Sequence, residues 1–238
     1  MAVVLSTSAP FARGGNRLCF VDPGNRERCI KVRRPDFTLA DRRRKKGFPK
    51  TLLPLSHFDD NREEHRVMSM LQRRNGDVLH QHVSRCYGTV QTDMGAGLVS
   101  ELIRDGDGAV SQTLKKVIWD EGMSRASQQA VNTLADFWMR YCIPSRDLLL
   151  HNIVVQRGGD GEILRLVVID GLGSAGLVPL QRLPALLQRK KTRKKVANLH
   201  HRIQQLLALR GLPEFPGFHG ELLHDDRPAC CRSEKADS

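Results

Sequence analysis

The first part of the chain alternates short apolar runs with turn-forming residues, a pattern typical of paired β-strands. Arg17–Val21 and Arg28–Val32 are β-prone runs, and Asp22–Asn25 between them is a strong turn signal. Cys86–Thr92 and Leu98–Ile103 form a similar pair around a glycine-containing turn. The pattern therefore predicts two β-hairpins.

Between these hairpins the apolar positions change to helical spacing. Asp59–Arg73 begins with acidic residues and carries an apolar face, which predicts a helix. The basic segment Arg33–Lys50 contains proline and glycine and is expected to be an exposed connection. Later in the chain, one amphipathic helix is expected to end at Pro144, and Pro184–Leu209 predicts one or two basic helices.

A third hairpin is predicted from Ile153–Gln156 and Ile163–Ile169, which flank a glycine-rich turn. The break at Asp105–Gly108 predicts a boundary between an N-lobe of residues 1–104 and a C-lobe of residues 105–238. The segment after Gly211 is rich in proline, glycine and charge, and we expect it to fray. The predicted fold class is α+β, with a β-rich N-lobe and a short, mostly helical C-lobe.

The chain is strongly basic, with a net charge of +12 and a pI near 9.9. Such a charge attracts polyanions, so an anionic acceptor or peripheral contact with an anionic surface is expected. Nucleic acid is not expected as the partner, because only 5% of residues are aromatic and stacking surfaces are poorly supplied. The basic run Lys190–Lys195 is interpreted either as a solvated helix face or as a docking patch for an anionic substrate.

Cysteine usage and apolar runs indicate a cytoplasmic protein. The six cysteines are scattered without a C-x-x-C pair, which indicates a reducing compartment and argues against zinc. No run of about 18 apolar residues is present, so no transmembrane helix is expected. The N-terminus lacks the basic start and long apolar core of a signal peptide. His80 and His82 lie in a polar stretch and are interpreted as surface residues.

Two polar motifs set into apolar strands carry the candidate chemistry. Asp147 is followed five residues later by Asn152, then by the predicted hairpin and by Asp170-Gly171. Kinases use this order, in which the first Asp receives the substrate proton and the Asn and second Asp hold magnesium on ATP. Taken singly, Asp147 could be a turn residue after Pro144, and Asp170-Gly171 a plain turn. Their joint occurrence favours Asp147 as catalytic residue, and Asn152 and Asp170 as magnesium ligands.

Phosphoryl transfer also needs a cation on the nucleotide phosphates. Lys31 lies within the apolar run Cys29–Val32, like the lysine of the V-A-I-K strand in kinases. A buried ammonium needs an anionic partner, and Glu64 on the following helix is the candidate, with Glu63 as the alternative. Alone, Lys31 could be the outward residue of an edge strand, and either glutamate could simply favour the helix N-terminus.

Further candidates for nucleotide binding come from the two ends of the predicted N-lobe. Gly14 and Gly15 precede the first strand, where a kinase has its phosphate-covering loop, although the full G-x-G-x-x-G pattern is absent. An ordinary turn is the alternative for these glycines. Glu101 and Ile103, at the end of the last predicted N-lobe strand, complete the candidate set.

These residues resemble the PhoP regulatory network protein YrbL family, a bacterial group with a protein-kinase-like fold. The resemblance covers roughly residues 10–210, and the matching stretches are Arg28–Val32, the helix Arg62–Leu71, Tyr87–Asp93, Gly97–Val99, and Asn152 through Asp170 and Gly173. It implies an ATP-cleft architecture related to small bacterial sugar and lipopolysaccharide kinases, and it implies no particular substrate.

The chain also departs from related patterns. Some family members lack an aspartate at the position of Asp147, which this chain retains. Compared with ordinary protein kinases, Ser145 replaces the histidine of H-R-D, and neither D-F-G nor A-P-E is present. Only 68 residues follow Asp170, fewer than a peptide-docking C-lobe needs. A small-molecule, sugar or lipopolysaccharide-type hydroxyl is therefore the expected acceptor.

Three functional hypotheses follow, of which the third, a nucleic-acid binder, rests on charge alone. The first is a phosphotransferase that depends on ATP and magnesium. The second is a pseudokinase, a nucleotide-binding regulatory module, which the missing histidine, glycines and A-P-E favour.

Overall fold

The computed structural model describes residues 2–46, 48, 54, 59–173, 180 and 183–226. Its contacts divide the chain into two compact units. The first contains Met1–Met70 and Arg85–Leu102, and the second contains Leu71–Ser84 and Ile103–Ser238. The division expected from sequence, at residue 104, kept 71–84 with the N-lobe, whereas the contacts place that segment in the second unit. The first unit is β-rich and the second is mostly helical, which confirms the α+β class.

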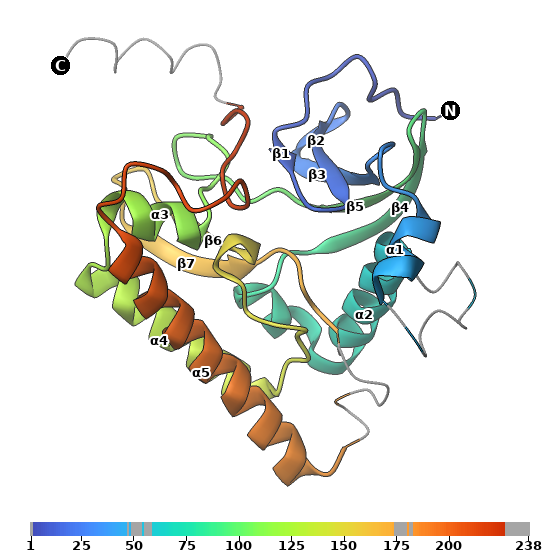
Figure 1. The fold of residues 1–238 in the computed structure, drawn as a ribbon. Coiled ribbons are helices and arrows are strands. Elements are labelled where there is room, and N and C mark those ends of the chain that lie inside the picture. The colour runs from blue at the N-terminus through green and yellow to red at the C-terminus, as the bar shows by residue number, and fades with distance from the viewer. Residues whose placement is uncertain are drawn as a thin grey trace, which may run out of the picture. The chain divides into compact units, whose positions relative to one another are not determined.

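The first unit contains a five-stranded antiparallel sheet (Figure 1). Its spatial order is β1 (Ala12–Arg13), β2 (Arg17–Asp22), β3 (Asn25–Arg33), β5 (Gly95–Glu101), β4 (Cys86–Thr92). Both hairpins predicted for this part of the chain, β2–β3 and β4–β5, are confirmed.

Alternation along the strands builds the core of this unit. Ile30 and Val32 of β3 pack with Phe20 of β2 and with Leu5 from the segment before the sheet. Gly97 in β5 is required by this packing, because a Cβ there would lie 2.5 Å from Ile30 Cγ2. Lys31 lies between Ile30 and Val32 on β3 and is also buried.

Between the two hairpins the described residues form two α-helices, followed by a 3₁₀ helix. α2 (Asp60–Asn75) corresponds to the helix predicted from periodicity. The expectation that Arg33–Lys50 is only a connection was wrong, because α1 (Leu39–Lys46) forms within it; residues 47, 49 and 50 lie outside the described part. α1 begins with a reciprocal cap in which the Asp41 N–H donates to Thr38 Oγ1 (3.1 Å) and the Thr38 N–H donates to the Asp41 carboxylate (3.0 Å).

The second unit combines helices with a two-stranded sheet (Figure 1). In chain order its elements are the 3₁₀ helix η3 (Gly76–Gln81), α3 (Leu114–Glu121), α4 (Arg125–Tyr141), the 3₁₀ helix η4 (Leu150–Asn152), β6 (Ile153–Arg157), β7 (Ile163–Val168) and α5 (Ala185–Leu209). The predicted third hairpin is confirmed as β6–β7. The basic segment forms one helix, α5, which packs beside α4. Among the described helices, none is long and apolar enough to cross a bilayer.

The expectation that His80 and His82 lie on the surface was wrong. Both residues are buried in the second unit. His82 Nδ1 lies 2.8 Å from the Leu166 carbonyl oxygen, and its ring packs 4.9 Å from Phe137. His80 Nδ1 lies 3.1 Å from the carbonyl oxygen of Val83. The two imidazoles therefore satisfy backbone groups and fix the segment before β4 against the β6–β7 sheet.

The chain after Gly211 does not fray over its described residues, contrary to expectation. Phe215 packs edge-on against Trp119 of α3, with ring centroids 5.8 Å apart. Lys115 donates to the carbonyl oxygens of Pro216 (2.5 Å) and His219 (2.9 Å). Further along, other side chains and main-chain groups of the second unit bond to Gly220, Asp225 and Asp226. We call residues 215–226 the C-terminal strap (red in Figure 1).

Candidate functional site

A buried ion cluster surrounds Lys31 in the first unit. Lys31 Nζ donates to Glu64 Oε1 at 2.9 Å, and Arg17 donates to the other carboxylate oxygen, Oε2, at 2.6 Å. The side chains of Lys31 and Glu64 are each 6% exposed, and that of Arg17 is 10% exposed. Glu64 therefore serves two cations at once, while Glu63 forms an exposed pair with Arg66. Of the two glutamates weighed from the sequence, Glu64 is the one that contacts Lys31.

Asn61 ties this cluster to the sheet. Its side-chain amide donates to the carbonyl oxygens of Lys31 (2.9 Å) and Ala96 (3.2 Å), and its Oδ1 accepts from Arg17 (3.1 Å). Asn61 and Glu64 are three residues apart on α2, so they share a helix face. Sequence reasoning missed Arg17 and Asn61, although a polar residue three positions before Glu64 was a signal for a shared polar face.

The neighbouring thiol of Cys29 is shielded by the same core. Burial raises the pKa of the Cys29 thiol, an effect that the nearby Lys31 ammonium partly offsets. Its Sγ lies 3.2 Å from Ser100 Oγ. Cys29 is therefore held as a neutral thiol beside the ion cluster. All four described cysteines are free, and Cys230 and Cys231 lie outside the described residues.

Gly14 and Gly15 form the turn between β1 and β2. The Gly14 N–H donates to the Arg17 carbonyl oxygen at 2.8 Å, and the carbonyl oxygens of Gly14 and Gly15 accept from Arg34 at 3.5 and 3.2 Å. A Cβ on Gly14 would meet only Arg17 O, at an ordinary contact distance of 3.5 Å. The turn is thus compatible with a side chain at position 14, and its glycine is not required sterically.

Glu101 and Ile103 fall in different units. Glu101 ends β5, and its Oε2 accepts from the Arg85 N–H at 2.9 Å. Ile103 is buried with Val154 and Val167 in the core of the second unit, and its carbonyl oxygen accepts from the Ser111 N–H at 3.0 Å. That carbonyl oxygen has a second lone pair, so the bond from Ser111 does not prevent it from accepting a hydrogen bond from a nucleotide.

The structure brings Asp147, Asn152 and Asp170 together around Gly171 in the second unit. Gly171 has φ 82°, and a Cβ on it would lie 3.0 Å from Asn152 Nδ2 and 3.3 Å from the Asp147 carbonyl oxygen. The Asp170 carboxylate accepts from the Gly171 N–H at 2.5 Å. The Ile169 N–H donates to the Asn152 carbonyl oxygen at 2.9 Å. The glycine therefore allows the two predicted motifs to approach each other.

Local main-chain bonds hold these motifs in place. The Arg146 N–H donates to the Gly171 carbonyl oxygen at 2.8 Å, and Ser145 and Leu172 form an isolated antiparallel bridge. Asn152 ends η4, whose turn is closed by a bond from its N–H to the Leu149 carbonyl oxygen at 2.9 Å. The Asp147 and Asp170 segments are thus paired like two short strands, which fixes the spacing between their main chains.

Helix α5 adds a cation that sequence reasoning did not assign to the site. Arg202 Nη2 donates to Asp147 Oδ2 at 2.5 Å, while Asp147 Oδ1 accepts from the Leu148 N–H at 3.1 Å. The other terminal nitrogen, Arg202 Nη1, is buried and has no hydrogen-bond partner among the described residues. Lys195, two turns earlier on α5, donates to the Arg146 carbonyl oxygen. The helix therefore contacts the candidate catalytic segment at two points.

His151 lies between the two candidate residues in sequence and beside the C-terminal strap in space. Its ring stacks on His219, with centroids 5.0 Å apart and an interplanar angle of 19°. Burial, followed by the neighbouring His219 and Lys115, lowers the pKa of His151 to about 4, against a smaller opposing effect of Asp170. His151 is therefore a neutral imidazole at physiological pH.

The oxygen donors at this site suit a hard cation that takes part of its coordination from elsewhere. Among the described residues, no group of three or more His, Cys, Asp or Glu side chains could hold a metal ion alone. Magnesium is usually bound by one or two carboxylates together with substrate phosphates and water. The Asn152 amide oxygen and the Asp170 carboxylate fit that mode, in which a nucleotide brings the remaining ligands.

Comparison with known proteins gives relatives that match most of the chain. Proteins named YrbL from Escherichia coli (strain K12) and Shigella flexneri are each 29% identical over 180 residues, which covers 74% of this chain and 76% of theirs. A solved structure of Rad53 residues 1–466 in complex with AMP-PNP is similar with a TM-score of 0.45 and 14% identity, over 87% of this chain and 48% of that chain. The chain therefore spans about half the length of the Rad53 chain.

The family comparison extends over both units. The model of the PhoP regulatory network protein YrbL family matches residues 3–204, from the segment before the sheet to the last turns of α5. The chain therefore belongs to the PhoP regulatory network protein YrbL family.

Proposed function

We propose that the chain is a phosphotransferase that depends on ATP and magnesium and transfers a phosphoryl group to a hydroxyl. The observation that carries this proposal is the convergence of Asp147, Asn152 and Asp170 around Gly171. Their order along the chain and their residue types are those that phosphoryl transfer uses for the acceptor and for the metal. The buried Lys31–Glu64 pair supplies the remaining charged group that such a reaction needs.

Lys31 would bind the α- and β-phosphates of ATP, with Glu64 holding its ammonium in position. A lysine on a buried strand has few rotamers, and the 2.9 Å bond to Glu64 fixes the direction in which its Nζ points. Positioning of this kind supplies much of the catalysis in phosphoryl transfer, because the protein does little covalent chemistry. Arg17 shares the carboxylate and would keep Glu64 ionised and oriented.

Asn152 and Asp170 would hold magnesium. When bound there, the ion would neutralise charge on the phosphate oxygens. The protein's contribution is to orient the two oxygen donors, which it does through the η4 turn at Asn152 and through the Gly171 N–H bond to Asp170. ATP and magnesium are thus the proposed cofactors.

Asp147 would orient the acceptor hydroxyl and receive its proton. A carboxylate has about four lone-pair positions, and the contacts from Arg202 and the Leu148 N–H use two of them. A hydroxyl can therefore bond to Asp147 while the ion pair with Arg202 remains. We propose a small-molecule, sugar or lipopolysaccharide-type hydroxyl as the acceptor, and the cytoplasm, where ATP is supplied and free thiols persist, as the location.

Binding of a non-hydrolysable ATP analogue tests the metal site. Isothermal titration of the wild type with AMP-PNP should show tighter binding in magnesium than in EDTA, and Asp170→Ala should lose that difference. Asp160→Ala, in the exposed β6–β7 turn, is the matched control and should retain it. A wild type that binds equally well in EDTA, or an Asp170→Ala variant with full magnesium dependence, would contradict the assignment.

A pseudokinase is the second candidate, and one observation favours it. Both carboxylate oxygens of Asp147 are already bonded within the protein, one of them to a guanidinium. In that case the chain would bind nucleotide as a regulatory module without transferring phosphate. ATP turnover in the presence of candidate acceptors separates the two, since a phosphotransferase should lose turnover in Asp147→Asn, whereas a module binds nucleotide without turnover in either form.

A further inference from the structure

The first half of helix α5 carries a concentrated positive charge. Between Ala185 and Leu209 the sequence has seven lysines and arginines and no aspartate or glutamate. Six of the seven lie within 189–195. A surface helix in a soluble protein usually interleaves both signs to form stabilising pairs three and four residues apart. This helix forgoes such pairs, which points to an external anion as the partner of its charge.

The packing of α5 fixes which side of the helix faces outward. Its buried residues are Thr192, Leu199, Ile203 and Leu206. Lys190, Lys191, Arg193 and Lys194 are exposed, and none of them pairs with a carboxylate among the residues that the structure describes. We call these four residues the basic patch.

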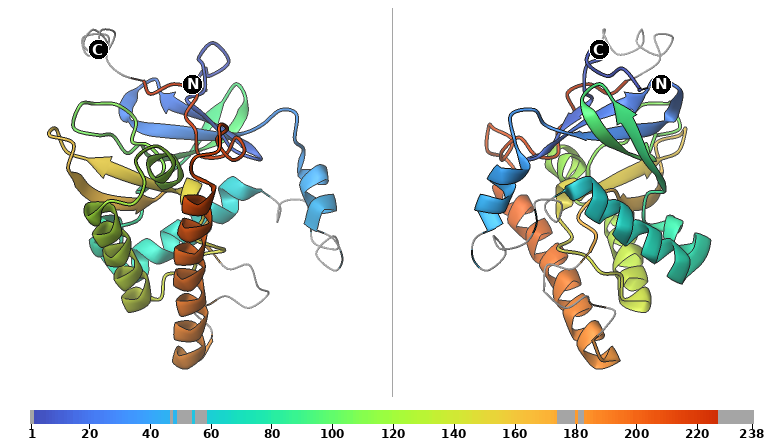
Figure 2. Two further views of the ribbon diagram at one scale, coloured as in Figure 1. Left: turned by 60° about the vertical axis from the view of Figure 1, so that its left-hand side comes forward. Right: turned by 90° about the vertical axis from the view of Figure 1, so that its right-hand side faces the viewer.

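Two exposed leucines adjoin the basic patch. Leu186 is 81% exposed and Leu187 is 46% exposed, both in the first turn of α5. Leu186 lies four residues before Lys190, and Leu187 lies four residues before Lys191, so each leucine shares a helix face with a lysine. In both figures that show the ribbon alone, this end of α5 extends past the end of α4 (Figures 1 and 2).

We propose that the basic patch with Leu186 and Leu187 docks the protein on an anionic phospholipid surface. The lysines and arginine would contact headgroup phosphates, and the two leucines would enter the boundary between headgroups and acyl chains. Exposed leucines would add apolar burial to the electrostatic attraction of the lysines for anionic lipid. Single-stranded nucleic acid would be served better by Phe, Tyr or Trp side chains for base stacking, and α5 contains none of these three.

The same helix reaches the candidate catalytic segment. Leu187 and Arg202 are fifteen residues apart on α5, which corresponds to roughly 22 Å along the helix axis. Arg202 contacts Asp147, and Lys195 contacts the Arg146 carbonyl oxygen. If the proposed phosphotransferase function holds, an acceptor hydroxyl on a lipid-linked sugar could reach Asp147 while the tip of α5 rests on the surface. The docking itself does not depend on that function.

Sedimentation of the full chain with vesicles tests the docking. The protein should bind vesicles of phosphatidylcholine with one quarter phosphatidylglycerol, should not bind phosphatidylcholine alone, and should bind more weakly as salt is raised. Changing all four residues of the basic patch to Gln should weaken binding by about fivefold for each cation, or several hundredfold together. Leu186→Ser with Leu187→Ser should weaken it by about tenfold or more.

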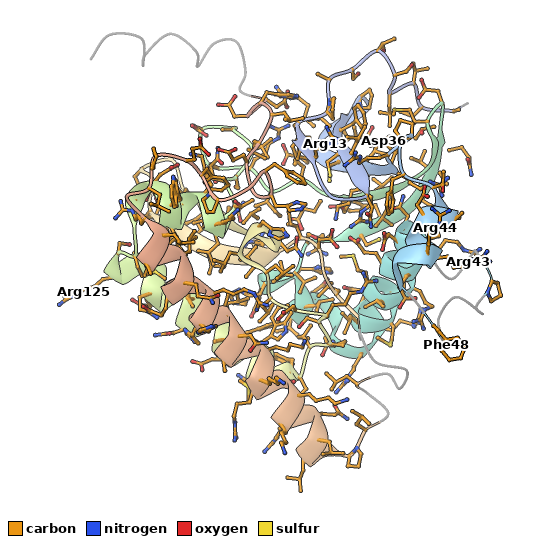
Figure 3. All side chains as sticks on the ribbon, in the orientation of Figure 1. Arg13, Asp36, Arg43, Arg44, Phe48 and Arg125 are labelled. Carbon is orange, nitrogen blue, oxygen red and sulfur yellow. The ribbon has the colours of Figure 1, made fainter. Side chains whose placement is uncertain are left out.

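A variant of equal net charge is the control. Arg62, Arg73, Arg74 and Arg125 are exposed cations on other helices, and Figure 3 shows Arg125 projecting from the ribbon. Changing these four to Gln removes four charges from +12 and leaves +8, as in the patch variant. The control should bind vesicles within about tenfold of the wild type, and thermal melts should show that both variants are folded.

Two results would overturn the inference. An equal loss of vesicle binding in the patch and control variants would mean that net charge alone drives adsorption. Tighter binding to single- or double-stranded RNA than to vesicles, lost in the patch variant, would assign the surface to nucleic acid. AMP-PNP binding by the patch variant should match the wild type, so failure of the docking and failure of the proposed function can be told apart.

Discussion

Replacing Glu64 by glutamine should destabilise the protein far more than replacing its neighbour Glu63. Glu64 neutralises Lys31 and Arg17, and the three side chains are at most 10% exposed. Breaking a buried pair by removing one partner costs about 3–5 kcal/mol, because the remaining charge is left without compensation. Glu64→Gln keeps the shape and can accept one hydrogen bond, so we expect about 3 kcal/mol.

The exposed pair gives the internal reference. Glu63 and Arg66 are 34% and 67% exposed, and pairs of this kind contribute about 0.5 kcal/mol or less. For a chain of this size, 1 kcal/mol corresponds to about 2–4 °C in Tm. The Tm should therefore fall by about 6–12 °C in Glu64→Gln and by at most about 2 °C in Glu63→Gln.

The position of the carboxylate between two cations also sets an order of effects. Lys31→Met leaves Glu64 bonded to Arg17, so a charge pair remains, whereas Glu64→Gln leaves two buried cations facing a neutral amide. Lys31→Met should therefore cost less than Glu64→Gln. Urea denaturation followed by circular dichroism gives the free energy of unfolding of each variant. Equal losses in Glu63→Gln and Glu64→Gln, or a larger loss in Lys31→Met, would refute the reasoning from burial.

Two further predictions concern Gly171 and His82. Gly171→Ala should bind AMP-PNP in magnesium at least tenfold more weakly than Gly161→Ala, as measured by titration. Both glycines have φ near 80°, but only at position 171 would the added Cβ meet the Asn152 side chain. Equal affinities would show that this contact is not needed. Burial lowers the pKa of His82 below its usual value, so the unfolded chain binds the proton at a higher pH than the folded chain does. The stability that the neutral His82 contributes is therefore fully present above about pH 6.5 and declines as the pH falls below that value. His82→Gln should flatten the decline in the free energy of unfolding, measured by urea titration between pH 7.5 and 5.5, by up to about 1.4 kcal/mol per pH unit, and an unchanged slope would contradict this role.

The strands were predictable because their signals are local. Each hairpin joins two apolar runs through turn residues, and the Gly24 N–H bond to Asp22 Oδ1 at 2.9 Å shows how the first turn is closed within three residues. α1 was missed because it has almost no apolar residues, so periodicity gives no signal. Its only evidence in the sequence is the cap formed by Thr38 and Asp41, which a reader of the sequence could have used.

The candidate site was predictable only in part, because only some of its residues are marked by a local sequence pattern. Asp147, Asn152 and Asp170 follow a known order along the chain, and so could be assigned without coordinates. Arg202 lies 55 residues beyond Asp147, and no pattern links the two. Arg17 begins a strand, where a charged residue usually faces solvent. It is buried because it contacts Glu64 and Asn61 of α2. Contacts between distant segments decide such positions, and composition does not record them.

The C-terminal strap has a consequence for the order in which the chain can assemble during synthesis. Residues 71–84 of the second unit are made early, yet α3 receives Phe215, Pro216 and Gly220 only after α5 has been made. A nascent chain that has just completed α5 would still expose Trp119 and would leave Lys115 without its two carbonyl partners. Ribosome pausing or premature termination shortly after Leu209 should therefore yield a protease-sensitive product with exposed apolar surface, even though every helix and strand that the structure describes has already been translated.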